Sequence, residues 1–190
     1  GRFFNTAGAG LCRECSARTW PFRLSRAAAP YEGVLREAIH RFKFGGRRGT
    51  TGFLGELMVE VLDREPAYRE VAVVVPVPLG RKRLKERGFN QAELLAAVVA
   101  GRYGFRLVRA LQKRGDTSPQ ARLDKAARFD NVAGSFYVLD NSIIAGKTVL
   151  LVDDVFTTGS TLSAAAAALL AGGAGQVLGV TLAAGRTCFT

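Results

Sequence analysis

Cysteine is scarce in this sequence, and long apolar runs are missing from it. The 190 residues include three Cys, at positions 12, 15 and 188, an odd number that does not suit the disulfide framework of a small secreted domain. No run of about 18 or more apolar residues occurs, so no membrane span is predicted. The N-terminus lacks the charged-then-apolar pattern of a secretory signal. We therefore expect a cytoplasmic protein.

Acidic residues are few relative to basic ones. The chain has 16 Asp and Glu against 27 Lys and Arg, which makes its formal net charge +11. Such an excess suits an anionic partner, either a polyphosphorylated metabolite or a nucleic acid. A solvated Arg-rich surface explains the same charge, so the class of partner has to come from motifs.

Hydrophobic residues make up 48% of the chain, enough for one domain with a sizeable core and a small appendage. The expected appendage is residues 1–30, an irregular segment that contains two of the cysteines. Beyond it, hydrophobic periodicity predicts two helices within 31–64, further helices at 92–99 and 160–170, buried strands at 71–77, 148–152 and 176–182, and a weaker strand at 105–111.

This alternation predicts an α/β fold, with a doubly wound, mainly parallel sheet over residues 31–190. In such sheets, ligands bind outside the carboxyl ends of the strands. Residues 112–147 form a polar and charged stretch that is too long for a simple turn. We expect them to be a flexible active-site loop or a hairpin.

The segment 149–161 carries the clearest chemistry. An apolar strand ends in Asp153 and Asp154, whose carboxylates only accept hydrogen bonds and therefore suit the paired hydroxyls of a ribose. A turn rich in hydroxyl groups follows and opens a helix, where free backbone N–H groups and the helix dipole bind phosphate. The residues predicted to hold that phosphate are Thr157, Thr158, Gly159, Ser160 and Thr161. Ordinary helix capping explains one Asp or one Thr, but not the whole run.

A P-loop ATPase is the nearest alternative, because Gly146-Lys147-Thr148 resembles part of a phosphate-binding loop. That loop requires a glycine at position 141, which is Asn141 here, and it must follow a strand. This Gly-Lys-Thr precedes one. We therefore reject the ATPase interpretation.

The run 149–161 resembles the phosphoribosyl-pyrophosphate (PRPP) signature of type I phosphoribosyltransferases. The resemblance implies that Asp153 and Asp154 hold the ribose and that residues 157–161 cradle the 5-phosphate. It also implies that Mg²⁺ accompanies the pyrophosphate, which the loop after the first core strand would bind. In this chain that loop is Val77, Pro78, Leu79 and Gly80.

Further motifs narrow the resemblance to the ComF family of bacterial competence proteins, over about residues 12–185. They are, in order, Tyr31-Glu-Gly33, Val75-Pro-Val-Pro78, Arg87-Gly-Phe-Asn90-Gln91, Thr117-Ser-Pro-Gln120 and the segment 128–136. The resemblance implies that the 112–147 loop closes over the active site.

Basic and amide side chains within these motifs suit the same ligand. Arg87, Lys43 and Arg128 can meet phosphate oxygens, while Asn90 and Gln91 open a helix and can direct their amides at the strand ends. Surface charge is the alternative for Arg87, since Arg and Lys precede it. We favour function for Arg87, and solvation for Arg81, Lys82, Arg83 and Lys85.

Cys12 and Cys15 make half of a zinc site, because structural zinc takes four ligands. ComF-like proteins commonly carry a four-cysteine N-terminal ribbon, of which residues 1–30 would be a remnant. Zn²⁺ is therefore expected only if further ligands lie upstream. His40 and Cys188 are weaker candidates to complete the set. We favour an ordinary structural role for His40 and no role at the site for Cys188.

The resemblance favours one function and leaves two alternatives. The favoured function is a ComF-like phosphoribosyltransferase-type protein that binds PRPP and Mg²⁺, acts in DNA uptake and natural transformation, and transfers phosphoribose to an unknown acceptor. The second is a non-catalytic competence module that binds a nucleotide or single-stranded DNA and acts with other competence proteins. The basic stretch 81–114 fits it, although few aromatic residues offer stacking platforms there. The third is a nucleotide-salvage enzyme.

Overall fold

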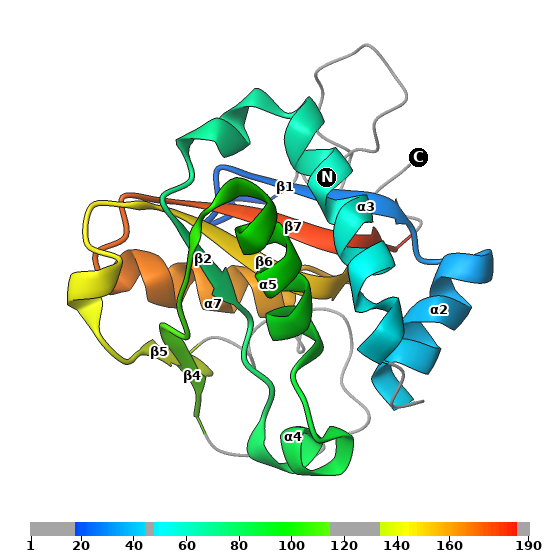
Figure 1. The fold of residues 1–190 in the computed structure, drawn as a ribbon. Helices are drawn as coiled ribbons and strands as arrows, with labels where there is room; N and C mark the ends of the chain where they lie inside the picture. Colours follow the sequence, from blue (N-terminus) through cyan, green and yellow to red (C-terminus); the bar gives the residue numbers. More distant parts are fainter. Residues whose placement is uncertain (1–17, 45–47, 115–133, 186–190) are drawn as a thin grey trace.

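The computed structural model describes residues 18–44, 48–114 and 134–185, which build a layered α/β fold (Figure 1). Its centre is a five-stranded sheet in the order β1-β7-β6-β2-β3, and every strand pair in it is parallel. The strands are β1 (Leu24–Pro30), β2 (Val73–Pro76), β3 (Arg106–Leu107), β6 (Thr148–Phe156) and β7 (Gln176–Ala184). The expected α/β class with a mainly parallel sheet is confirmed.

Both faces of the sheet are buried, which explains why its central strands are continuous apolar runs. In β6, Val149 and Leu151 pack on one face and Leu150 and Val152 on the other, all of them fully buried. Three helices cover the second face, namely α2 (Gly33–Phe44), α3 (Thr51–Arg64) and α5 (Gln91–Tyr103). The helix α7 (Ser160–Ala171) covers the first (Figure 1).

Smaller elements complete the described chain. The strands β4 (Leu111–Lys113) and β5 (Phe136–Val138) form a separate antiparallel pair that packs on the α7 side of the sheet. The short helix α4 (Arg81–Arg87) follows β2 and stands away from the sheet (Figure 1). Single 3-10 turns occupy Arg48–Thr50, Pro66–Glu70 and Asn141–Ile143. No helix among the described residues has the length and apolar character needed to cross a membrane.

Two expectations need adjustment, and a third agrees with the structure at the base of the expected hairpin. Leu24–Pro30, placed in the irregular appendage, is an edge strand paired with β7; its Ala-rich sequence lacks the β-branched residues that mark a strand. The strand expected at 105–111 is shorter and belongs to two sheets, as β3 and β4. The β4–β5 pair forms the base of the 112–147 stretch. Residues 115–133 of this stretch lie outside the described part of the chain.

The order of the strands creates a switch point between β2 and β6. From β2 the chain moves to one side, through α5 to β3, and then returns to β6 on the other side and continues through α7 to β7. The connections therefore diverge from the gap between β2 and β6, where doubly wound proteins bind their ligands. The two loops expected to hold PRPP follow these two strands directly.

Close packing of α3 on α5 yields a first prediction. A Cβ on Gly55 of α3 would lie 2.5 Å from Cβ of Val98, whereas one on Gly52 meets nothing within 4 Å. We expect Gly55→Ala to lower the free energy of unfolding by about 1–3 kcal/mol through overpacking, and Gly52→Ala to maintain or raise it. Thermal unfolding of both variants tests this, and equal effects would contradict the close contact.

Candidate functional site

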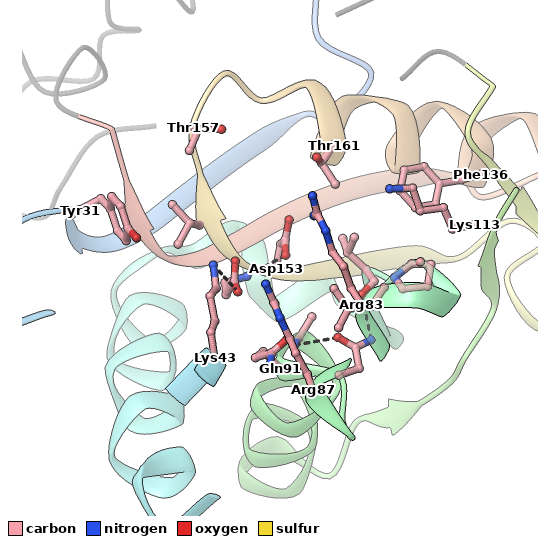
Figure 2. A pocket seen from close by; sticks show the side chains of 18 residues that line it. Tyr31, Lys43, Arg83, Arg87, Gln91, Lys113, Phe136, Asp153, Thr157 and Thr161 are labelled. Atoms are coloured by element: carbon pink, nitrogen blue, oxygen red, sulfur yellow. Dashed lines mark hydrogen bonds and ion pairs between the residues drawn. The ribbon is translucent and has the colours of Figure 1, made fainter. Parts of the chain in front are cut away.

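A cavity of about 230 Å³ lies at the carboxyl ends of β2 and β6 (Figure 2). The loop 77–80, α4 and the start of α5 form one side of it, and the end of β6 with the following turn forms the other. Among its described lining residues, four are basic (Lys43, Arg83, Arg87 and Lys113) and two are acidic (Asp153 and Asp154). The cavity thus favours a ligand with several negative charges.

The two carboxylates lie within the last part of β6, where successive side chains point to opposite faces of the sheet. Asp154 shares the face of α2, and its Oδ2 is 2.8 Å from Nζ of Lys43, with both side chains less than one fifth exposed. Asp153 accepts a hydrogen bond from the backbone N–H of Asp154 at 2.9 Å. Both acids line the cavity, but Lys43, expected at a phosphate, contacts a carboxylate in this structure.

Burial, and then the neighbouring charge of Asp154, raises the pKa of Asp153 to about 7, although Lys43 and Lys113 act in the opposite direction. The folded protein thus disfavours the charged form of the Asp153 carboxyl group. Ionisation is therefore electrostatically unfavourable at one of the groups expected to bind the ligand, and perturbed groups of this kind are common at functional sites.

The turn after β6 depends on Gly159. Its φ is +77°, a value that other residues rarely adopt, and an added Cβ would lie 2.5 Å from Cζ of Phe156. On either side of Gly159, the hydroxyls of Thr158 and Ser160 are 2.7 Å apart and bond to each other, while Thr157 and Thr161 line the cavity. Hence the turn offers the ligand two hydroxyls and the first N–H groups of α7.

Aromatic side chains support this turn from behind. The ring of Trp20 stacks on Phe22 at a centroid distance of 5.2 Å and lies 5.9 Å from Phe156. A Cβ on Gly159 would also come within 2.6 Å of Trp20. The residues that precede β1 therefore pack directly against the turn, a contact between sequence-distant residues that no motif indicated.

Asn90 and Arg87 form the wall on the opposite side. The Asn90 side chain accepts from the N–H of Ala92, capping α5, and donates from Nδ2 to the carbonyl of Val77 at 3.0 Å. It thereby ties the 77–80 loop to α5, so its amide serves the loop's position. Arg87 donates to Oε1 of Gln91 at 3.1 Å, and its guanidinium lies 4.9 Å from the centroid of the Phe44 ring.

Arg83 is exposed, in line with the expected solvated charge, but it also lines the cavity, which the sequence did not indicate. Figure 2 shows its guanidinium reaching toward Thr161 beside that of Arg87. Its spacing of four residues from Arg87 on a helix was the available signal, but the sequence around it did not indicate a helix. Lys113 reaches the cavity from β4, which no local pattern indicated.

Several predicted residues lie outside the described part of the chain. They are Cys12, Cys15, Thr117, Gln120, Arg128 and Cys188. Within the described part, no cluster of three or more His, Cys, Asp or Glu residues could hold a metal ion alone. Mg²⁺ commonly takes one or two carboxylates, several waters and phosphate oxygens of the substrate. Asp153 and Asp154 fit that mode when a phosphorylated ligand supplies the remaining oxygens.

The raised pKa of Asp153 yields a second prediction. An acid with a raised pKa binds more protons in the folded than in the unfolded state, so stability falls as pH rises from about 4 to about 7. Asp153→Asn removes this cost. We expect its Tm at pH 8 to exceed that of the wild type by at least about 2 °C, with a flatter pH dependence.

Asp154→Asn is the matched control, because it leaves Lys43 partly buried beside a neutral group. We expect it to lower the Tm at every pH at which the wild-type ion pair exists. Equal pH profiles for Asp153→Asn and the wild type would contradict the burial of charge at Asp153.

Comparison with known proteins gives consistent matches. Residues 84–188, more than half of the chain, match the phosphoribosyl transferase domain model. The chain is 29% identical over 168 residues to Competence protein ComFC of Bacillus subtilis, covering 84% of this chain and 66% of that protein. It is 31% identical over 170 residues to DNA utilization protein YhgH of Escherichia coli K12, covering 87% and 74%.

ComFC of Streptococcus pneumoniae is 29% identical over 142 residues, covering 73% of this chain and 58% of that protein. The chain thus spans about two thirds of the length of its B. subtilis relative. The sheet order, the site and these similarities agree: the chain belongs to the phosphoribosyltransferase family of type I fold, as a ComF-like member.

Proposed function

We propose that the cavity binds PRPP together with Mg²⁺ and that the protein transfers phosphoribose to an acceptor during DNA uptake or use. The observation that carries the proposal is that the two loops expected to bind phosphate meet at one cavity, across a pair of carboxylates. The turn 157–161 lies at the end of β6, the loop 77–80 lies at the end of β2, and Asp153 and Asp154 lie between them.

Each part of PRPP has a partner in this arrangement. The 5-phosphate would accept hydrogen bonds from Thr157, Thr161 and the first turn of α7, where the helix dipole favours an anion. The ribose hydroxyls would donate to Asp153 and Asp154. The diphosphate would then lie at the 77–80 loop within reach of Arg87.

The same side chains suit the chemistry of transfer. The bond between C1 of the ribose and the diphosphate oxygen breaks, pyrophosphate leaves with the electron pair, and the acceptor's nucleophilic atom bonds to C1. Arg83 and Arg87 would stabilise negative charge on the departing diphosphate. Mg²⁺ would neutralise part of that charge when bound. The carboxylates would hold the ribose while positive charge develops on it.

The biological setting of the proposal comes from the relatives. One is called a competence protein and the other a DNA utilization protein. We extend this setting to the present chain because both matches cover more than four fifths of it.

Binding of the 5-phosphate gives a third prediction. Thr161→Val keeps the shape of the side chain but removes its hydroxyl from the cavity wall. We expect the affinities for PRPP and ribose 5-phosphate to fall about tenfold, the effect of one hydrogen bond to a charged group, and the affinity for pyrophosphate to stay unchanged. Calorimetry with MgCl₂ measures all three.

Thr51→Val is the matched control. The Thr51 hydroxyl is buried in α3 away from the cavity, and no described residue bonds to it. This variant should bind all three ligands like the wild type. A wild-type protein that is folded and binds neither PRPP nor ribose 5-phosphate would overturn the proposed function.

Single-stranded DNA is a second candidate ligand, supported by α4. Five of its seven residues are Lys or Arg, and residues 81–86 are exposed. Three of these basic residues, Arg81, Lys82 and Lys85, are not among those that line the cavity. They therefore remain available to a phosphate backbone outside it.

The fourth prediction separates these two ligands. Changing Arg81, Lys82 and Lys85 to Ala together should weaken binding of single-stranded oligonucleotides and make the slope of log affinity against log salt shallower by about 2, since each phosphate contact contributes about 0.7. PRPP binding should not change. Changing Arg36, Arg41 and Arg64 instead removes the same charge from α2 and α3. Equal slopes for the two variants would exclude α4 as the contact.

A further inference from the structure

Gln91 has a polar group that neither the fold nor the proposed contacts use. It is the first residue of α5, is 1% exposed and lines the cavity. Its Oε1 accepts the hydrogen bond from Arg87. Its Nε2 is buried, and within the described residues it has no hydrogen-bond partner.

The orientation of this amide follows from its neighbour. A guanidinium group only donates hydrogen bonds, so the atom of Gln91 that faces Arg87 must be the oxygen. The NH₂ group is then the one left without an acceptor. A buried donor without a partner destabilises a protein, and such a group in a ligand cavity indicates that a ligand supplies the acceptor.

A purely structural role does not account for Gln91. The start of α5 is already capped by Asn90, which also holds the carbonyl of Val77. The amide of Gln91 contributes its oxygen to Arg87, a side chain that is only half-buried and reaches into the same cavity. Gln91 and Arg87 thus lie side by side in the wall formed by α4, α5 and the 77–80 loop, and the buried Nε2 of Gln91 is the donor there that has no partner among the described residues.

We propose that Gln91 is a specificity-determining residue that donates from Nε2 to an oxygen of the ligand's diphosphate, beside Arg87. The inference rests on the proposed function, since it assumes that the cavity takes a ribose phosphate bearing a diphosphate. The pair lies across the cavity from the turn 157–161. It therefore contacts the diphosphate without contacting the 5-phosphate, and it favours PRPP over ribose 5-phosphate.

The decisive variant is Gln91→Met, the fifth prediction, because Met has a similar length and no polar hydrogen. We expect it to raise the Tm, since the buried NH₂ group is gone, and to lower the affinities for inorganic pyrophosphate and PRPP about tenfold or more. The affinity for ribose 5-phosphate should not change. Thermal unfolding and calorimetry with MgCl₂ measure both effects on the full chain.

Two further variants sharpen the test. Gln112→Met makes the same change at a glutamine that accepts a hydrogen bond from the Tyr137 hydroxyl at 2.7 Å and does not line the cavity. It should lower the Tm and leave all three affinities unchanged. Gln91→Glu keeps the acceptor for Arg87 but replaces the NH₂ group by oxygen, so it should weaken pyrophosphate binding more than Gln91→Met does.

The outcomes distinguish the inference from the proposed function. If the wild type binds pyrophosphate and PRPP and Gln91→Met binds them equally well, the inference is wrong and the proposed function stands. Equal losses of pyrophosphate and ribose 5-phosphate would show general damage to the cavity and would also overturn it. If the folded wild type binds neither PRPP nor pyrophosphate, both fall together.

Discussion

The pairing of β2 with β6 is the constraint on which the rest of the site depends. It runs in parallel from Val73 opposite Val149 to Pro76 opposite Val152, and it closes with the hydrogen bond from Val77 N–H to the carbonyl of Val152. Beyond this bond β2 turns away, while β6 continues to Phe156 beside β7. The carboxylates of β6 thus emerge where one neighbouring strand has just ended, so that a ligand rather than a strand can lie against them.

Part of this arrangement was predictable from local sequence. The run 149–161 indicated a strand, two acids, a glycine turn and a helix, and each of these is present, because the signals are local and backbone-driven. The mainly parallel sheet and a ligand site at the carboxyl ends of its strands also followed from the alternation of elements, whereas the order of the strands was not predicted. By contrast, β1 carries no strand signal in its own residues and depends on pairing with β7.

The side-chain partners at the site were much harder to predict. Lys43 and Asp154 are over a hundred positions apart, and only the packing of α2 on the sheet brings them together. The place of Arg83 in the cavity wall was not predicted, because α4 consists almost entirely of charged residues and has no apolar periodicity that would indicate a helix. Residue chemistry indicates which ligands a side chain can bind, but its neighbours depend on tertiary contacts.

Trp20 gives the site a link to the beginning of the chain. Its ring, with Phe22, backs the glycine on which the turn 157–161 depends. Suppose that ligand binding at the turn changes the free energy of Trp20 packing. Any event that reorders the residues around Trp20 then changes the free energy of ligand binding by the same amount, because such coupling is reciprocal. Trp20 is also the single tryptophan of the sequence, so its fluorescence reports on that coupling without an added label.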